Sequence, residues 1–275
     1  MRLKLKTIFS LKQHKLRNNL KEKSTLKNKF KSPSIGSWIT LAHPAIAEIM
    51  AKAGFDWLAV DLEHSVITIR EAEELIRVID LCHCKPLVRL TSNNVDQIKR
   101  VMDAGAHGII VPMIKSKEDA EKAVASVYYP SMGVRSVGLA RAQGYGTRFN
   151  DYQHWLKENA IVIVQIEHID AVNNIESILS VEGVDGYIIG PYDLSGSMNL
   201  IGQPTHPDVE NEIAHVEKIA KKLGMPGGIH IIEPDPEQLN KRIKQGFSFI
   251  AYSLDIRMLD YMCRQGLQNL QRPIA

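Results

Sequence analysis

Two acidic residues that follow apolar runs are the clearest chemical signal in this sequence. Glu167 ends an Ile/Val-rich run that begins at Ile161, and Asp193 follows a second run at 186–189. Near-continuous Ile and Val runs are typical of parallel strands buried on both faces. Because the strands of a strand–helix–strand unit point the same way, both carboxylates are expected at one edge of a sheet. They predict a site for a hard divalent cation with open positions for water and a chelating substrate; helix capping and turn formation are the structural alternatives.

Further polar side chains follow other apolar runs. Arg89 would be a fixed cation beside a substrate or enolate oxygen, or else it forms a salt bridge between helices. His64, in the segment Asp61-Leu62-Glu63-His64-Ser65, is a candidate general base because its pKa lies near the operating pH. A lone loop histidine is more often structural. The other residues at such positions are Pro112, Gln165, His230, Ser253 and Asp255.

The elements that must position these residues alternate regularly along the chain. The predicted strands are 35–41, 57–61, 86–90, 108–111, 161–167, 186–189, 227–231 and 249–252. The predicted helices are 44–53, 69–81, 95–104, 117–127, 171–179, 207–223, 236–245 and 256–270. Eight alternations in about 240 residues predict an α/β fold of the (β/α)8 TIM-barrel type, with the active site at the C-terminal ends of the strands. A doubly wound sheet is the alternative.

A long insertion at 128–160 interrupts the alternation. Its segment 133–146 is rich in glycine and arginine and predicts a lid or an anion-binding loop over the barrel mouth, with a subunit contact as the alternative. It matches neither the P-loop nor the dinucleotide-binding motif. No lysine ends a strand inside an apolar run, which favours metal activation of a carbonyl over imine formation.

Charge is distributed unevenly. Residues 1–31 carry eleven Lys and Arg and one acid, so this leader has a net charge of +10; since the whole chain carries +3, the remainder carries −7. An acidic body argues against nucleic-acid binding. The leader lacks the apolar core of a secretory signal and is interpreted as a solvated, partly helical extension. Contact with an anionic membrane surface or a polyanion is the alternative.

Membrane spans and disulfides are not indicated. No apolar run approaches the roughly 18 residues of a membrane span. Three cysteines are too few for a disulfide framework, which favours a reducing, cytoplasmic location. Cys82-His83-Cys84 has no second ligand pair, so we interpret these as ordinary residues at a helix end.

Five segments combine into a specific pattern: GSWITLAHPAIAEIMAKAGFDWLAVDLEHS, PLVRLTSNNVDQIKRVMDAGAHGIIVPMI, YYPSMGVRSVGLARAQGYG, VIVQIE and GVDGYIIGPYDLSGSMNLIGQPTHP. Over roughly residues 25–260 they resemble the metal-dependent class II pyruvate aldolases, the family of 4-hydroxy-2-oxoheptanedioate aldolase and 2-dehydro-3-deoxyglucarate aldolase. The resemblance implies a (β/α)8 barrel over 25–275, a homohexamer with the last helix packed on a neighbouring subunit, and reversible cleavage of a 4-hydroxy-2-oxo acid to pyruvate and an aldehyde. Residues 1–24 are a basic extension without a counterpart in that family.

The resemblance also implies residue roles. Glu167 and Asp193 would bind Mg²⁺ or Mn²⁺, with Co²⁺ as an alternative, and pyruvate would reach the ion through its keto and carboxylate oxygens. Arg89 would stabilise the enolate oxygen, and His64 would transfer a proton through water. Asp103 matches an acid that reaches this histidine from an adjacent subunit. The remaining implied positions are Asp61 and Glu63 in the acidic loop, Gln165 in the metal pocket, and the backbone of Gly190, Pro191 and Ser195 at the pyruvate carboxylate.

One departure and two other functions stay open. His230 stands where the degradative aldolases usually have an apolar residue, which affects the choice of aldehyde. One alternative function is a carbon–carbon lyase of citrate-lyase type acting on a CoA thioester. The other is a non-catalytic binding or scaffold protein recruited through the basic leader, although the intact set of Glu167, Asp193, Arg89 and His64 argues against it.

Overall fold

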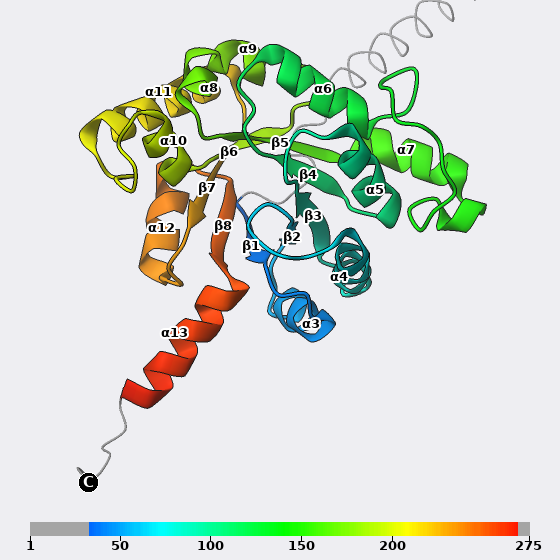
Figure 1. Ribbon diagram of the computed structural model, residues 1–275, viewed down its shortest axis with the longest axis horizontal. Helices are drawn as coiled ribbons and strands as arrows, with labels where there is room; N and C mark the ends of the chain where they lie inside the picture. Colours follow the sequence, from blue (N-terminus) through cyan, green and yellow to red (C-terminus); the bar gives the residue numbers. More distant parts are fainter. Residues whose placement is uncertain (1–32, 269–275) are drawn as a thin grey trace, which may run out of the picture.

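Eight parallel strands pair in chain order, and the eighth pairs with the first to close a barrel (Figure 1). The computed structural model describes residues 33–268. The strands are β1 (Ser34–Ile39), β2 (Trp57–Asp61), β3 (Lys85–Arg89), β4 (Gly108–Val111), β5 (Ile161–Ile166), β6 (Gly186–Ile189), β7 (Gly227–Ile231) and β8 (Phe249–Leu254). The predicted (β/α)8 TIM barrel is confirmed, and the doubly wound sheet is excluded. The basic leader lies outside the described residues.

Helices surround the barrel. They are α3 (Pro44–Lys52), α4 (Ile69–Leu81), α5 (Val95–Ala104), α6 (Lys117–Val127), α7 (Phe149–Asn159), α8 (Ile169–Asn173), α9 (Ile175–Leu179), α10 (Pro191–Ser197), α11 (Pro207–Leu223), α12 (Pro236–Gln245) and α13 (Asp255–Gln268). Local sequence sets several ends: Thr68 and Glu71 form a capping box at the start of α4, and Gly105 ends α5 in the left-handed conformation. Within residues 33–268, no helix has the length and apolar character that crossing a bilayer requires.

The barrel interior changes from apolar to polar along the strands. Its apolar part is a cluster of inward-facing side chains that includes Trp57, which stacks on Phe249 with ring centroids 4.3 Å apart. Gly36 leaves room for this pair, because a Cβ there would lie 2.0 Å from the Trp57 ring. Since alternate strand residues face inward, the last inward positions of four strands are polar. They are Asp61 on β2, Arg89 on β3, Gln165 on β5 and His230 on β7.

Several predicted boundaries need correction. The insertion 128–160 contains α7 and a short 3₁₀ turn at Gly144–Gly146, neither of which was predicted. Helix α7 was missed because no side chain caps its start, so the sequence lacks the residue that usually marks a helix N-terminus. The predicted helix 171–179 is divided into α8 and α9 at Asn174, a residue type that competes for backbone hydrogen bonds. Strand β1 ends at Ile39 rather than at residue 41. The reason is that the backbone N–H groups of Thr40 and Leu41 donate to the Asp255 carboxylate at 2.7 and 2.8 Å.

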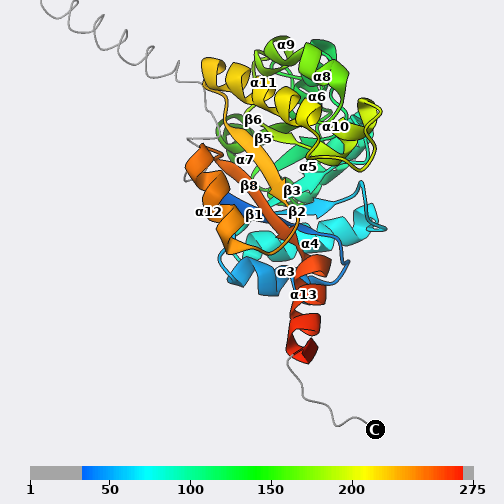
Figure 2. The same ribbon diagram turned by 90° about the vertical axis from the view of Figure 1, so that its left-hand side faces the viewer.

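Helix α13 projects away from the barrel in both ribbon views (Figures 1 and 2). Its apolar side chains Ile256, Leu259, Met262 and Leu267 are 45–60% exposed. Exposed apolar side chains of this kind are typical of interaction surfaces. The exposed face is compatible with the predicted packing of this helix on a neighbouring subunit. That contact stays a prediction, because the structure contains one chain.

Candidate active site at the barrel mouth

A cavity of about 720 Å³ opens at the C-terminal end of the strands. It brings together side chains from strands that are far apart in the sequence, and most of the predicted site residues are among them. Those that line it are Asp61, His64, Arg89, Gln165, Gly190, Pro191, Asp193 and His230. The cavity is therefore the candidate active site, as expected for a TIM barrel.

Arg89 is fixed by a two-point ion pair with Asp61 on the neighbouring strand. The pairing of β2 with β3 places the two residues side by side, and Nε and Nη2 of Arg89 donate to the two Asp61 carboxylate oxygens at 2.8 and 2.7 Å. Burial opposes the charge of Arg89, but the hydrogen bonds and charges of Asp61 and Glu63 keep the pKa of Arg89 above its ordinary value. The suggested salt bridge between helices is therefore wrong: Arg89 is a permanent cation held at the cavity.

Trp38, which sequence reasoning missed, forms a platform under this cation. Its ring is 2% exposed, and the Arg89 guanidinium carbon lies 4.4 Å from the ring centroid. A contact of this kind stabilises the cation and limits its movement. The sequence indicated only that Trp38 is one of the alternate residues of β1 that point into the barrel. This alternation does not distinguish a site residue from a core residue.

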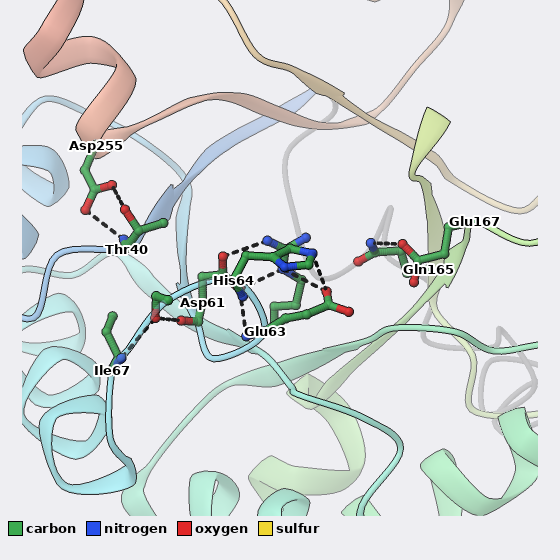
Figure 3. A network of polar contacts seen from close by, with 10 residues as sticks. Thr40, Asp61, Glu63, His64, Ile67, Gln165, Glu167 and Asp255 are labelled. Carbon is green, nitrogen blue, oxygen red and sulfur yellow. Dashed lines mark hydrogen bonds and ion pairs between the residues drawn. The ribbon is translucent and has the colours of Figure 1, made fainter. Parts of the chain in front are cut away.

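Asp61 also shapes the loop that carries His64 (Figure 3). Its Oδ1 accepts from the backbone N–H groups of Glu63 at 3.0 Å and His64 at 3.4 Å, and its backbone carbonyl accepts from the Ser65 hydroxyl. The His64 side chain is 62% exposed, and its Nε2 lies 3.8 Å from Glu63 Oε2. The imidazole therefore stands at the rim of the cavity, where it can meet substrate or water.

Glu167 is held rigidly beside the cavity, where it contacts the lining residue Gln165 (Figure 3). It is 2% exposed; Oε1 accepts from the Met113 backbone N–H at 2.7 Å, and Oε2 accepts from the Gln165 side-chain amide. His168, not Glu167, caps the following helix, so the capping alternative is wrong. Burial raises the pKa of Glu167 despite these hydrogen bonds, and the nearby charge of Asp193 raises it further.

These oxygen atoms fit a hard divalent cation. Gln165 Oε1 is buried and has no hydrogen-bond partner among the described residues. The Gln165 side chain contacts the Glu167 carboxylate, which the charge of Asp193 repels. A divalent cation would relieve that repulsion and satisfy the amide oxygen. Within 33–268 no group of three or more His, Cys, Asp or Glu side chains is arranged to hold a metal. Two carboxylates with water and substrate completing the shell are, however, a usual arrangement for Mg²⁺.

Four residues with predicted roles do not line this cavity: Glu63, Glu167, Ser195 and Asp103. Glu167 and Glu63 adjoin it through the lining residues Gln165 and Arg89, whereas the other two do not. Ser195 is fully buried, does not line the cavity, and donates its hydroxyl proton to the Tyr192 carbonyl at 2.6 Å. Asp103 lies at the C-terminal end of α5, which is the opposite end of the barrel because α5 runs antiparallel to the strands. Its Oδ1 accepts from Arg135 at 3.2 Å and from Gln143 at 3.1 Å. A contact of Asp103 with His64 therefore stays a prediction for an assembly of subunits.

The same contacts correct the interpretation of the insertion as a lid. Arg135 and Gln143 of the insertion are buried against Tyr129, and neither they nor any other residue of 133–146 lines the mouth cavity. Arg141 forms an ion pair of 2.5 Å with Asp80 at the end of α4. The insertion therefore packs against the C-terminal ends of α4 and α5, where Asp103 lies, and not over the mouth.

Replacing Gly190 by alanine is expected to displace the Glu167 carboxylate. The added Cβ would lie 2.8 Å from Glu167 Oε2 and 2.9 Å from Glu167 Cβ, so the carboxylate must move. If the carboxylate takes part in the reaction, a displacement of about 1 Å predicts roughly a 100-fold loss of catalytic activity. Gly196→Ala on α10 is the matched control, because nothing lies within 4 Å of its Cβ position. Equal activities of the two variants would contradict the assigned role of Glu167.

The raised pKa of Glu63 predicts that the free energy of unfolding, measured in the presence of a metal chelator, depends on pH. Burial, followed by the charge of Glu167, raises the pKa of Glu63 to about 7 from its ordinary value near 4.5. The folded state therefore binds the proton more tightly, and this stabilising contribution is lost as pH rises from about 4.5 through 7. Glu63→Gln should be more stable than the wild type at pH 8 by on the order of 2 kcal/mol, with little difference at pH 4.5.

Urea unfolding in EDTA at the two pH values measures this difference. Glu182→Gln, at an exposed position, is the control and should show no such change. A Glu63→Gln effect of the same size at both pH values would contradict the raised pKa.

Comparison with known proteins gives the family. The family model described as HpcH/HpaI aldolase/citrate lyase matches residues 34–260. The chain is 39% identical over 240 residues to the hydroxypyruvate/pyruvate aldolase of Sagittula stellata, covering 85% of this chain and 94% of that protein. It is 38% identical over 243 residues to the 4-hydroxy-2-oxo-heptane-1,7-dioate aldolase of Salmonella dublin, covering 85% and 91%. A crystal structure of a family member from Burkholderia cenocepacia superposes with a TM-score of 0.82 at 32% identity, covering 94% of this chain and 99% of that one. The chain therefore belongs to the HpcH/HpaI aldolase/citrate lyase family.

Proposed function

We propose that this protein is a divalent-metal-dependent aldolase that reversibly cleaves a 4-hydroxy-2-oxo acid to pyruvate and an aldehyde. The observation that carries the proposal is the set of opposed charges at one cavity. Asp193 lines the cavity, and the buried Glu167 carboxylate adjoins it through Gln165. The cation of Arg89, held by Asp61, lines the same cavity. Relatives of similar length that are 38–39% identical carry the names of aldolases that act on such oxo acids.

The residues divide the chemistry between them. In the cleavage direction the C4 hydroxyl loses its proton, the C3–C4 bond breaks, and its electron pair forms the enolate of pyruvate, which is then protonated at C3. Arg89 stabilises the negative charge that develops on the enolate oxygen. His64, at the rim of the cavity, exchanges the proton with the C4 hydroxyl through water. Glu167 and Asp193 would hold Mg²⁺ or Mn²⁺, which would supply Lewis-acid stabilisation of that enolate.

The assembly and the location belong to the same proposal. A homohexamer would bring Asp103 of one subunit towards His64 of another and would cover the exposed face of α13. We also propose a cytoplasmic location; the described cysteines are free thiols, which are typical of proteins in reducing compartments. The substrates are small oxo acids and aldehydes, and no nucleic acid takes part.

Release of pyruvate tests the function. Several 4-hydroxy-2-oxo acids are supplied with Mg²⁺, Mn²⁺ or Co²⁺ and in parallel with EDTA, and pyruvate is measured with lactate dehydrogenase. We expect pyruvate with metal and none in chelator. Full activity in EDTA, or none with any metal, would contradict the proposal. Turnover of a CoA thioester in place of a free oxo acid would support the citrate-lyase alternative. A protein inactive on every compound but localised by residues 1–24 would support the scaffold alternative.

A further inference from the structure

His230 occupies the mouth of the barrel beside the catalytic cation. It is the last inward position of β7, because its neighbours Ile229 and Ile231 pack outward in a separate apolar cluster. Its ring meets Trp38 edge-on, with ring centroids 5.7 Å apart, and Trp38 also lies under Arg89. The imidazole therefore lines the same cavity as the reacting groups of the proposed function.

The hydrogen bonds of the ring define which nitrogen carries the proton. A hydrogen bond with the Ser253 backbone favours the protonated ring, so the ring is the donor and the carbonyl oxygen the acceptor. Nε2 is buried and has no hydrogen-bond partner among the described residues, so Nδ1 makes this bond. Burial and the charge of Arg89 lower the pKa of His230 to about 4, so the ring is neutral at pH 7. Nε2 therefore offers a lone pair as a hydrogen-bond acceptor.

A buried acceptor without a partner inside the protein takes its partner from the cavity, either from water or from a ligand group that replaces the water. The donor must be a neutral O–H or N–H group, because carboxylate and keto oxygens only accept. In the chemistry proposed above, the group with these properties is an alcohol. The C4 hydroxyl is present in every substrate and is assigned to His64. A further hydroxyl is carried either by the oxo acid that forms the enolate, as in hydroxypyruvate, or by the aldehyde, as in glycolaldehyde.

We propose that His230 is a specificity residue that accepts, through Nε2, a hydrogen bond from a hydroxyl group of the substrate. This assignment rests on the proposed aldolase function and adds a preference for hydroxylated over deoxygenated partners. A site that hydrogen-bonds a substrate hydroxyl discriminates against the analogue without it, because the buried group is then left unpaired.

Two pairs of substrates test the assignment and distinguish the source of the hydroxyl. The first pair is hydroxypyruvate and pyruvate with acetaldehyde as the common acceptor, and the second is glycolaldehyde and acetaldehyde with pyruvate as the common donor. For each pair the ratio of kcat/KM values, hydroxylated over deoxygenated, is measured with Mg²⁺ for the wild type and His230→Leu. We expect the ratio of one pair to fall by about 10- to 100-fold in the variant. The value for the deoxygenated member should stay the same or rise.

Further variants and a second readout keep the result interpretable. His230→Met also removes the imidazole acceptor and fills irregular space, so it replaces His230→Leu if that variant does not fold. His230→Gln retains an acceptor and should keep part of the preference. Exchange of the pyruvate methyl protons in D₂O needs no substrate hydroxyl and reports enolate formation separately. Normal exchange with both ratios unchanged overturns the role of His230 alone, whereas no exchange by the wild type overturns the proposed function and this assignment with it.

Discussion

Replacing Glu167 by glutamine, or Asp193 by asparagine, is expected to lower the rate of aldol cleavage by at least about 1000-fold. Each change keeps the size of the side chain and removes one negative charge from the site that would hold the cation. For Glu167 the effect should be large, because its two oxygens are fixed by Met113 and Gln165. The affinity for Mg²⁺ should fall in parallel.

Calorimetric titration with Mn²⁺ and the pyruvate-release assay measure the two effects on the same preparations. Asp170→Asn is a matched control, because this carboxylate lies in the first turn of α8, close in sequence to Glu167, but is 56% exposed. It should bind metal and react as the wild type does. Undiminished metal binding by both Glu167→Gln and Asp193→Asn would place the metal elsewhere.

Replacing Arg89 by lysine is expected to lower kcat by about 100- to 1000-fold with a smaller change in KM. Lysine keeps the charge but cannot form the two parallel hydrogen bonds to Asp61 or spread over the Trp38 ring. The cation would no longer be fixed where the enolate charge develops. Stabilisation that is specific to the transition state appears in kcat.

Steady-state kinetics with one 4-hydroxy-2-oxo acid measures this change. Arg77→Lys is the matched control, because Arg77 forms an ordinary exposed ion pair with Glu73 one turn earlier on α4. It should leave both constants unchanged. An Arg89→Lys enzyme with kcat within about threefold of the wild type would show that a mobile charge is sufficient.

The fold, and the candidate site residues at the C-terminal ends of the strands, were predictable because they depend on the local pattern of apolar residues. Buried parallel strands are read from Ile/Val runs, and the chain direction then places the residues that follow them at one end of the barrel. Glu167, Arg89 and Asp61 were found in this way. Their pairing was not, because the partner of Arg89 depends on the register between β2 and β3.

Other features depend on contacts that no local pattern encodes. The cation platform of Trp38 is a contact between β1 and β3, and the burial of Arg135 requires Tyr129 and Tyr152 to meet it from other segments. A lid was predicted for residues 133–146 from composition, which says nothing about the end of the barrel that a loop covers. The role of Asp103 came from the family resemblance, and it concerns an assembly that a single chain does not contain.

Enolate formation is the step on which the whole account depends, and pyruvate alone reports it. The methyl protons of pyruvate are followed by ¹H NMR in D₂O with the enzyme, once with Mg²⁺ or Mn²⁺ and once with EDTA. The account predicts rapid loss of the methyl signal with metal, the background rate in EDTA, and the background rate with metal in Glu167→Gln. Exchange that is equally fast in EDTA, or absent with every metal, would contradict it.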